Sequence, residues 1–295
     1  MPAGAGASLC VLSLAAALAL SVACSEQRPI VTAPSPTSAV LLAAGDIGEC
    51  GSTGPADTGS LLDTLEGTVL AVGDLAYPSG TAEQFRTCYE AAWGRHKYRT
   101  YPAPGNHEYE TQNGQPYFNY FGSRAGLPGL GYYSFKSADW LILSLNSNVP
   151  ADRTSTQWAW VRAELMARNG NCSLAYFHHP LYSSGPNGDN PRLADLWDLF
   201  YEFNVDVVIS AHDHMYERFA RIAPTGQRDQ ARGIRQFIAG TGGALLYTTR
   251  LAHPSSEFRL STYGILKLTL ERDGYSWDFI QTGGTRADSG FSTCH

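Results

Sequence analysis

Five apolar runs along the chain are each followed by a short polar motif. The runs are VLLAAG, TVLAVG, TYPAPG, SLAYF and VDVVISA, and each except the third is typical of a strand buried in a parallel sheet. In open α/β sheets, ligands bind at the carboxyl ends of the strands, so we expect the motifs to gather along one edge. The motifs are Gly45-Asp46, Gly73-Asp74-Leu75-Ala76-Tyr77, Gly105-Asn106-His107-Glu108, Phe177-His178-His179-Pro180 and Ala211-His212-Asp213-His214.

The remaining pattern predicts helices between the early strands and hairpins toward the C-terminus. Thr81 is a suitable N-cap for the second helix, and Pro191 suits the first turn of the fourth. Two sheets packed face to face, with helices outside, would accommodate both parts. The expected strands are 40–45, 68–73, 132–135, 140–145, 173–177, 205–210, 235–240, 265–270 and 275–280, and the expected helices are 56–66, 81–93, 152–168 and 191–203.

Composition is that of a globular protein. Of the 295 residues, 43% are hydrophobic and 16% are charged, and we predict one domain over residues 39–295. The net charge of −6 argues against a nucleic-acid-binding surface, which needs a basic footprint, so no nucleic acid partner is expected. A phosphorylated substrate is compatible with this charge, because bound cations can supply a positive field locally.

The N-terminal segment predicts export. Residues 1–24 carry no charged side chain and contain an apolar stretch of signal-peptide length. The stretch ends in the letters LSVAC, which resemble a bacterial lipoprotein box with Cys24 as the acylated residue; an ordinary secreted form is the alternative. Residues 25–38 have the Pro, Ser and Thr content of a linker. We expect a protein of the bacterial cell envelope, touching the membrane only through a lipid at Cys24, or else a periplasmic or secreted one.

Four cysteines follow the leader, and an even number in an exported chain suggests two disulfides. Three pairings are open. We favour Cys50–Cys88, since both lie in loops near the first two strands, and Cys172–Cys294, which would tie the C-terminus to the start of a strand.

Carboxylates and imidazoles recur at the predicted strand ends. Asp46 and Asp74 each follow a glycine, and two carboxylates on neighbouring strand ends would raise each other's pKa unless cations relieved the repulsion. His212 and His214 are two residues apart and would face the same side of an extended segment.

Other motif residues have ordinary explanations when taken singly. Asn106 lies in a Pro-Gly turn, and turn-forming Asn is common. Tyr77 precedes Pro78 and would be a loop aromatic. An extended backbone would turn the side chains of His178 and His179 to opposite sides, so we expect only one of them, His178, to reach the shared edge.

Taken together and in this order, the five motifs resemble those of the calcineurin-like metallophosphoesterases. Tyr77, three residues after Asp74, makes the purple acid phosphatase branch the most similar. The resemblance implies an α/β fold, namely a four-layer αββα sandwich of two mixed β-sheets flanked by helices, with a two-metal centre. It implies that Asp46, Asp74, Tyr77 and His214 hold the first metal, and that Asp74, Asn106, His178 and His212 hold the second.

The same resemblance implies the chemistry. A metal-bound hydroxide would attack the phosphorus of a small phosphate ester, while Asn106 and His107 bind the substrate and His107 acts in catalysis. Phenolate from Tyr77 would favour Fe³⁺ at the first site, and the second would take a divalent ion, Zn²⁺, Mn²⁺ or Fe²⁺. The last motif has Ala211 where the family usually has glycine; the change adds one methyl, and we expect binding to be retained.

The leading expectation is an acid phosphatase-like phosphomonoesterase. A phosphodiesterase or nucleotidase would use the same motif residues and is the alternative on this scaffold. The third hypothesis is a non-catalytic envelope lipoprotein with a metal site. It is less favoured, because His107 would then have no role. The loop 182–190 contains no histidine, although relatives often place one directed at the substrate there, so the acid that protonates the leaving group stays open. Asn187 or Asp189 lining the mouth of the site is one alternative, and a plain solvated loop is the one we favour.

Overall fold

The computed structural model describes residues 38–170, 172–248 and 251–295. The predicted signal peptide, with Cys24, and nearly all of the predicted linker lie outside these residues, so their boundaries stay predictions. None of the helices in the described part of the chain is long and apolar enough to cross a membrane.

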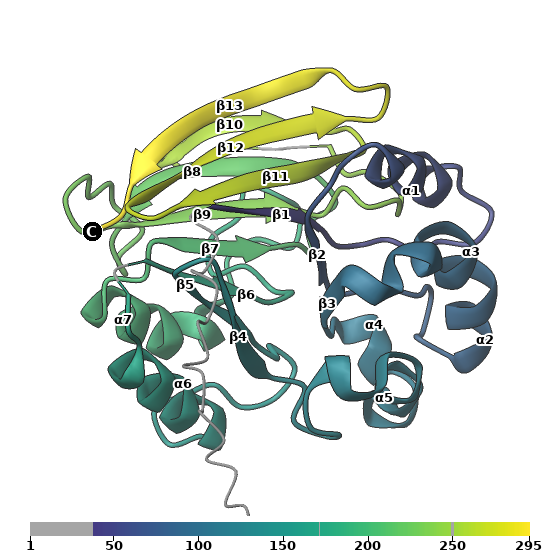
Figure 1. The fold of residues 1–295 in the computed structure, drawn as a ribbon, viewed down its shortest axis with the longest axis horizontal. Coiled ribbons are helices and arrows are strands. Elements are labelled where there is room, and N and C mark those ends of the chain that lie inside the picture. The colour runs from purple at the N-terminus through teal and green to yellow at the C-terminus, as the bar shows by residue number, and fades with distance from the viewer. Residues whose placement is uncertain (1–37, 171, 249–250) are drawn as a thin grey trace, which may run out of the picture. The chain divides into compact units, whose positions relative to one another are not determined.

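The described strands form two mixed sheets (Figure 1). The first sheet contains, in spatial order, β13 (Arg286–Thr293), β12 (Gly274–Gln281), β11 (Gly264–Glu271), β1 (Ala39–Ala44), β2 (Thr68–Val72) and β3 (Thr100–Ala103). The second contains β10 (Ser256–Leu260), β8 (Tyr216–Ile222), β9 (Ile234–Ala239), β7 (Val207–Ser210), β6 (Ser173–Tyr176), β5 (Trp140–Ser144) and β4 (Tyr133–Ser137). Strands β1, β2 and β3 are parallel, as are β5, β6, β7 and β9.

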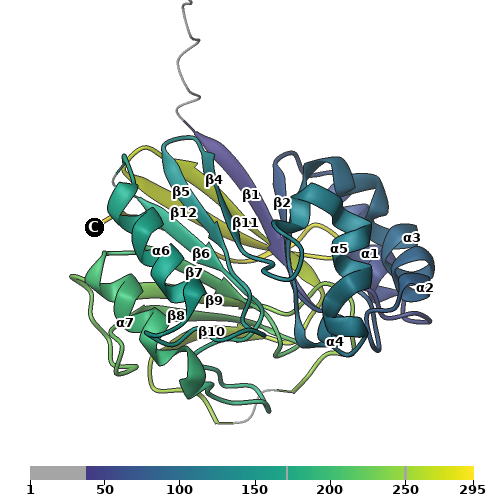
Figure 2. The ribbon, with the colours of Figure 1, turned by 90° about the horizontal axis from the view of Figure 1, so that it is seen from below.

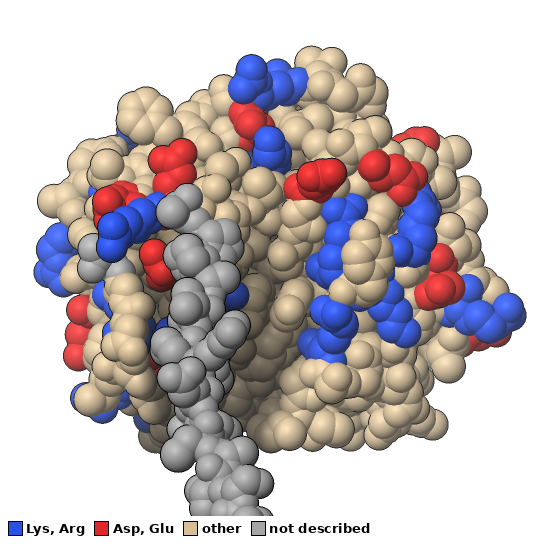
Figure 3. Space-filling view, viewed as in Figure 1, with Lys and Arg blue, Asp and Glu red and all other residues tan. Residues whose placement is uncertain are grey.

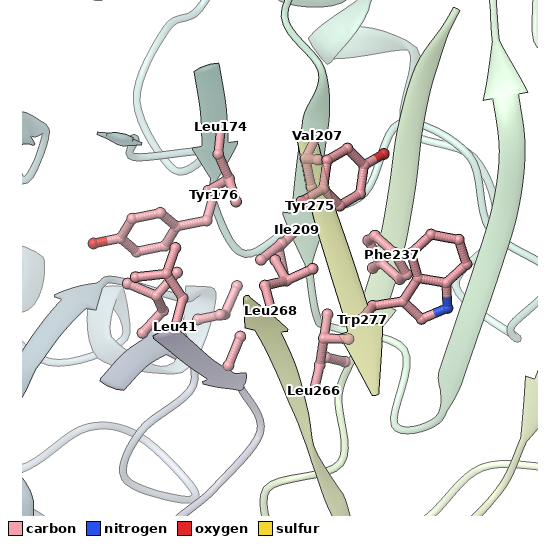
Figure 4. Close-up of a cluster of buried hydrophobic side chains, with 14 of the residues drawn as sticks. Leu41, Leu174, Tyr176, Val207, Ile209, Phe237, Leu266, Leu268, Tyr275 and Trp277 are labelled. Carbon is pink, nitrogen blue, oxygen red and sulfur yellow. The ribbon is translucent and has the colours of Figure 1, made fainter. Parts of the chain in front are cut away.

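The main hydrophobic core lies between the sheets. Figure 4 shows Leu41 and Leu268 of the first sheet opposite Ile209 and Phe237 of the second. Alternate residues of β11 face opposite sides, because Leu268 belongs to this core whereas Ile265 packs toward helices. Burial of these apolar side chains is the main force that holds the sheets together.

Helices cover the outer faces of both sheets (Figure 2). Leu62 and Trp93 pack on the first sheet, and Val161 and Trp197 pack on the second. The resulting four layers confirm the expected αββα sandwich. The helices are α1 (Gly54–Asp63), α2 (Ala82–Gln84), α3 (Glu90–Trp93), α4 (Asn106–Tyr109), α5 (Gln115–Phe121), α6 (Thr156–Ala167) and α7 (Ala194–Glu202).

The third apolar run was wrongly expected not to be a strand. It forms β3, which pairs in parallel with β2 and places Pro102 beside Ala71. Proline cannot donate a ladder hydrogen bond, but β3 is at the edge of its sheet, where that loss is tolerated. Strands β8, β10 and β13 were not expected at all, since charged residues such as Arg218 and Asp288 interrupt their apolar alternation.

The segment 81–93 is helical as expected, and Thr81 is its N-cap. The Thr81 hydroxyl accepts a hydrogen bond from Gln84 N, and the Gln84 side chain accepts one from Thr81 N. This reciprocal pair satisfies two amides that a helix start leaves free. The helix is not uniform, because a π-helical turn, Phe85–Tyr89, separates α2 from α3.

Both expected disulfides are present. Cys50 bonds to Cys88, and Cys172 bonds to Cys294 across a sequence separation of 122 residues. The second disulfide attaches the residue after β13 to the residue before β6, and therefore links the ends of two strands from different sheets.

Charged residues of both signs are interspersed on the face in Figure 3. Several are paired, for example Arg95 with Asp63 at 2.6 Å and Arg153 with Asp195 at 2.9 Å.

Candidate metal centre

The candidate ligands come from the carboxyl ends of five parallel strands. Asp46 follows β1, Asp74 follows β2, and Asn106 follows β3 at the start of α4. His178 follows β6, and the segment with His212 and His214 follows β7. Two sheets therefore contribute to one site, in which the structure brings together Asp46, Asp74, Tyr77, His107, His178, His212 and His214.

Four groups form one half of the site, around the hydroxyl of Tyr77. This hydroxyl donates to Asp46 Oδ1 at 2.8 Å and lies 3.3 Å from Asp74 Oδ2 and 3.2 Å from His214 Nε2. His214 Nε2 is also 3.4 Å from Asp46 Oδ1. Two carboxylates, a phenol and an imidazole thus converge on one small volume.

The other half of the site shares Asp74. Its Oδ2 lies 3.0 Å from His178 Nε2, which in turn lies 3.2 Å from His212 Nδ1. Asn106 Oδ1 is buried and has no hydrogen-bond partner among the described residues. A buried carbonyl oxygen without a partner costs free energy, and a cation would satisfy it.

Hydrogen bonds fix which nitrogen faces the centre in two of the three imidazoles. His178 Nδ1 is 3.0 Å from the carbonyl oxygen of Val72, and His214 Nδ1 is 2.7 Å from that of Leu245. A carbonyl can only accept, so Nδ1 carries a proton in both rings and Nε2 is the nitrogen that faces the site. This orientation by backbone carbonyls is common among metal-binding histidines.

The charges of this set suit cations. Burial tends to raise the pKa of Asp46, but His214 and the neighbouring imidazoles hold that pKa below its usual range. Burial and the carboxylates of Asp46 and Asp74 raise the pKa of Tyr77 well above its ordinary value, so the phenol alone stays protonated. A cation beside these oxygens would lower the pKa of Tyr77 and favour its phenolate form. Oxygen and imidazole donors together fit transition-metal ions, so the residues suit the two expected metals.

Glycines allow the loops to approach this closely. A Cβ at Gly105 would lie 2.1 Å from Asp74 Oδ1, and one at Gly240 would lie 2.6 Å from Asp46 Oδ2. Gly45 also makes room for Ala211, because a Cβ at Gly45 would lie 2.5 Å from the Ala211 Cβ. The extra methyl of Ala211 is therefore accommodated next to the site.

Three candidate ligands have a left-handed backbone. Asp46 has φ 57°, Asp74 has φ 52° and His212 has φ 70°. Such conformations are uncommon for residues other than glycine and cluster at functional sites. They turn the chain sharply at the ends of β1, β2 and β7, which aims these side chains inward.

Glu108 connects two of the motif loops, a role that the sequence did not reveal. Its buried carboxylate accepts hydrogen bonds from Asp74 N at 2.9 Å, Leu75 N at 2.7 Å and Gly105 N at 2.7 Å. Burial and the Asp74 charge raise the pKa of Glu108 to about 7, while the amide donors favour its ionised form. The only sign of this role was its place in the third motif.

His107 lies over the first half of the site and is partly exposed. Its ring centroid is 4.5 Å from that of Tyr77, and its Nε2 is 3.7 Å from Asp74 Oδ2. Its Nδ1 contacts the carbonyl oxygen of Pro78, which leaves Nε2 available at the surface of the site.

The expectation that His179 turns away was wrong. Its ring centroid lies 4.4 Å from that of His212 and 5.0 Å from that of His178. The segment leaves β6 before these residues and is not extended there, so the alternation of a strand does not apply.

The loop 182–190 is also better anchored than expected. Ser183 and Ser184 are buried, and Ser184 N donates to Glu217 at 3.0 Å. Asn187 Nδ2 donates to the carbonyl oxygen of His212 at 3.0 Å. The loop therefore packs against the segment after β7, and Asn187 does lie next to the site.

Comparisons with known proteins agree with this geometry. The family model described as calcineurin-like phosphoesterase matches residues 39–216. Purple acid phosphatase 18 of Arabidopsis thaliana is 29% identical over 259 residues, covering 79% of this chain and 57% of that protein. Acid phosphatase type 7 of Homo sapiens is 28% identical over 251 residues, covering 70% of this chain and 56% of that protein. The chain spans little more than half the length of these relatives.

Among solved structures, purple acid phosphatase PPD1 from yellow lupin seeds superposes with a TM-score of 0.79 at 18% identity. The match covers 88% of this chain and 55% of the lupin chain, and at this identity it supports the fold. The chain belongs to the calcineurin-like phosphoesterase family and is similar within it to the purple acid phosphatase branch.

Proposed function

We propose that this chain is an exported phosphomonoesterase of the acid phosphatase type that works with two metal ions. The observation that carries the proposal is the pair of donor sets that share Asp74. In addition, His107 belongs to neither set and is partly exposed beside them. A purely structural metal site would leave that histidine without a function.

The proposed first metal would be held by Asp46, Asp74, Tyr77 and His214, and the proposed second by Asp74, Asn106, His178 and His212. Such ions would supply Lewis acidity at the phosphoryl oxygens and promote ionisation of water. We propose Fe³⁺ beside Tyr77, because phenolate is a hard anionic donor, and Zn²⁺, Mn²⁺ or Fe²⁺ beside Asn106.

The protein's own groups would bind and orient the ester. His107 would direct Nε2 toward a phosphoryl oxygen, since its Nδ1 is engaged with the Pro78 carbonyl. In its protonated form this nitrogen would stabilise the charge that develops on phosphorus and could donate a proton to the leaving alkoxide. The backbone hydrogen bond from His107 N to Asp74 Oδ1, at 2.9 Å, holds this histidine in register with the shared carboxylate.

Two disulfides support export, because such bonds persist in oxidising compartments. Lipid attachment at Cys24 is part of the proposal. In a bacterial host, wild-type protein should incorporate radiolabelled palmitate and the Cys24→Ala variant should not. Equal incorporation by the two proteins would rule out lipid attachment at Cys24.

Metal analysis and an ester assay test the function together. Purified protein should contain close to two metal ions and hydrolyse p-nitrophenyl phosphate faster than bis(p-nitrophenyl) phosphate. The Asp74→Asn variant should bind neither metal, and its kcat/KM should fall at least a hundredfold. The Asp63→Asn variant, a surface control, should keep both the metals and the activity. Faster diester hydrolysis would replace the monoesterase with a diesterase. If metal-loaded protein cleaves neither ester, the enzyme proposal fails.

A further inference from the structure

A pocket lies near the second half of the site and is separated from it by His179. It has a volume of about 290 Å³ and is bordered by Ser147 and Arg192. Ser147 Oγ lies 2.7 Å from His179 Nδ1, and the ring of His179 lies 4.4 Å from that of His212. One imidazole therefore separates the wall of the pocket from a candidate ligand of the second metal.

Ser147 and His179 make two contacts, which hold this wall of the pocket in position. Ser147 Oγ accepts a hydrogen bond from His179 N at 3.1 Å and lies 2.7 Å from His179 Nδ1. Arg192 is the cationic residue among those that line the pocket.

Arg192 has an exposed guanidinium that makes no ion pair and no side-chain hydrogen bond within the described residues. Its backbone position is nonetheless fixed, because Arg192 N donates to Asn190 Oδ1 at 3.3 Å and the next residue, Leu193, is buried. Arg153, by contrast, is neutralised by Asp195 at 2.9 Å and by Asp198 at 2.6 Å.

The rest of the lining is mainly apolar, and its one carboxylate, Asp152, makes no ion pair with Arg192 within the described residues. Val149, Pro150 and Ala151 are apolar, and they reduce local solvation of an ion that enters. The Asp152 carboxylate accepts hydrogen bonds from the amide and hydroxyl of Thr154 within its own turn.

We infer that this pocket is a subsite for a second anionic group of the substrate, with the Arg192 guanidinium as its counter-ion. The inference rests on the proposed function and narrows its substrate class to phosphate monoesters whose alcohol part carries a carboxylate. Guanidinium and carboxylate match in shape and can form two parallel hydrogen bonds. A small hydroxy acid would reach from the shared site into the pocket beside His179.

A matched pair of esters tests the inference. 3-Phosphoglycerate carries a carboxylate where glycerol 3-phosphate has a hydroxymethyl group. We expect the wild type to bind 3-phosphoglycerate more tightly, both as KM and by calorimetry. In Arg192→Met this preference should fall about tenfold, and Arg192→Lys should recover part of it. The control is Arg162→Met on the outer face of α6, which should keep the wild-type preference.

The outcomes separate the subsite from the proposed function. If both esters are hydrolysed but Arg192→Met weakens them equally or not at all, the subsite is refuted and the enzyme stands. If neither ester is hydrolysed and calorimetry still shows a preference that Arg192→Met removes, the subsite stands and the esterase is refuted. Absence of both hydrolysis and preference would refute both.

Discussion

Among single residues, Asp74 has the most connections in the candidate centre. Its Oδ2 lies near Tyr77 and His178, and its Oδ1 accepts a hydrogen bond from His107 N. Its left-handed backbone, with φ 52°, requires stabilisation by its surroundings. Glu108 supplies part of this stabilisation, because its carboxylate accepts a hydrogen bond from Asp74 N.

Glu108→Gln tests this support. The amide group would place an N–H against backbone donors that now face an oxygen, so the free energy of unfolding should fall by about 1–3 kcal/mol. Metal content should fall as well, because the loops of Asp74 and Asn106 would separate. Denaturant unfolding and metal analysis measure the two effects. Glu66→Gln, at an exposed position, is the control, and similar behaviour of both variants would contradict this role.

At the scale of elements, the two hairpin strands β4 and β5 are joined at a strained residue. Ala138 has φ 51°, a left-handed conformation that is unfavourable for a residue with a Cβ. The turn shows that a short connection can impose a conformation which its sequence does not favour.

Ala138→Gly should therefore stabilise the protein by about 0.5–1 kcal/mol, since glycine adopts this conformation without strain. The same change at Ala91, exposed in α3, should destabilise by about 0.5–1 kcal/mol, because glycine weakens a helix. Denaturant unfolding of both variants checks the opposite signs. A loss of stability in Ala138→Gly would show that the turn is not strained.

The disulfides also stabilise the arrangement of elements, because each one links two segments that are far apart in the sequence. Removing Cys172–Cys294 should lower the free energy of unfolding by about 5 kcal/mol and removing Cys50–Cys88 by about 4 kcal/mol, as longer closed loops restrict the unfolded chain more. Paired Cys→Ala variants, compared by denaturant unfolding, test this order. A larger loss from the shorter loop, which spans 38 residues, would contradict it.

At the scale of the whole molecule, the candidate centre depends on the packing of two sheets. Asp46 and Asp74 come from the first sheet, and His178 and His214 from the second. Buried polar contacts help to join the sheets. Asp288 of β13 accepts hydrogen bonds from Tyr216 at 2.8 Å and from Arg218 at 2.8 Å, both on β8.

Asp288→Ala would leave the Arg218 charge and the Tyr216 hydroxyl without this partner. Arg218 would keep its ion pair with Glu257, so the free energy of unfolding should drop by about 1–3 kcal/mol. Asp278→Ala, which removes a surface pair with Arg286 at 3.0 Å, should cost about 1 kcal/mol or less. Thermal and denaturant unfolding compare them, and equal losses would argue against an inter-sheet role for Asp288.

The sequence by itself determined the layers and the candidate set. Period-two alternation and continuous apolar runs are local signals, so they predicted β1, β2, β6, β7 and the last hairpin. The order of the five motifs predicted which polar residues would be neighbours, and both disulfides were anticipated from their positions beside strand ends. The metal-binding and catalytic roles of these residues remain predictions.

Only the tertiary structure decided the remaining features, because they depend on contacts between distant segments. Strand β3 tolerates Pro102 because it lies at a sheet edge, and β8 and β13 tolerate charges because Arg218 and Asp288 pair across the sheets. His179 reaches His212 because the chain leaves β6 before it. The role of Glu108 arises from amides of another loop, which local sequence cannot specify.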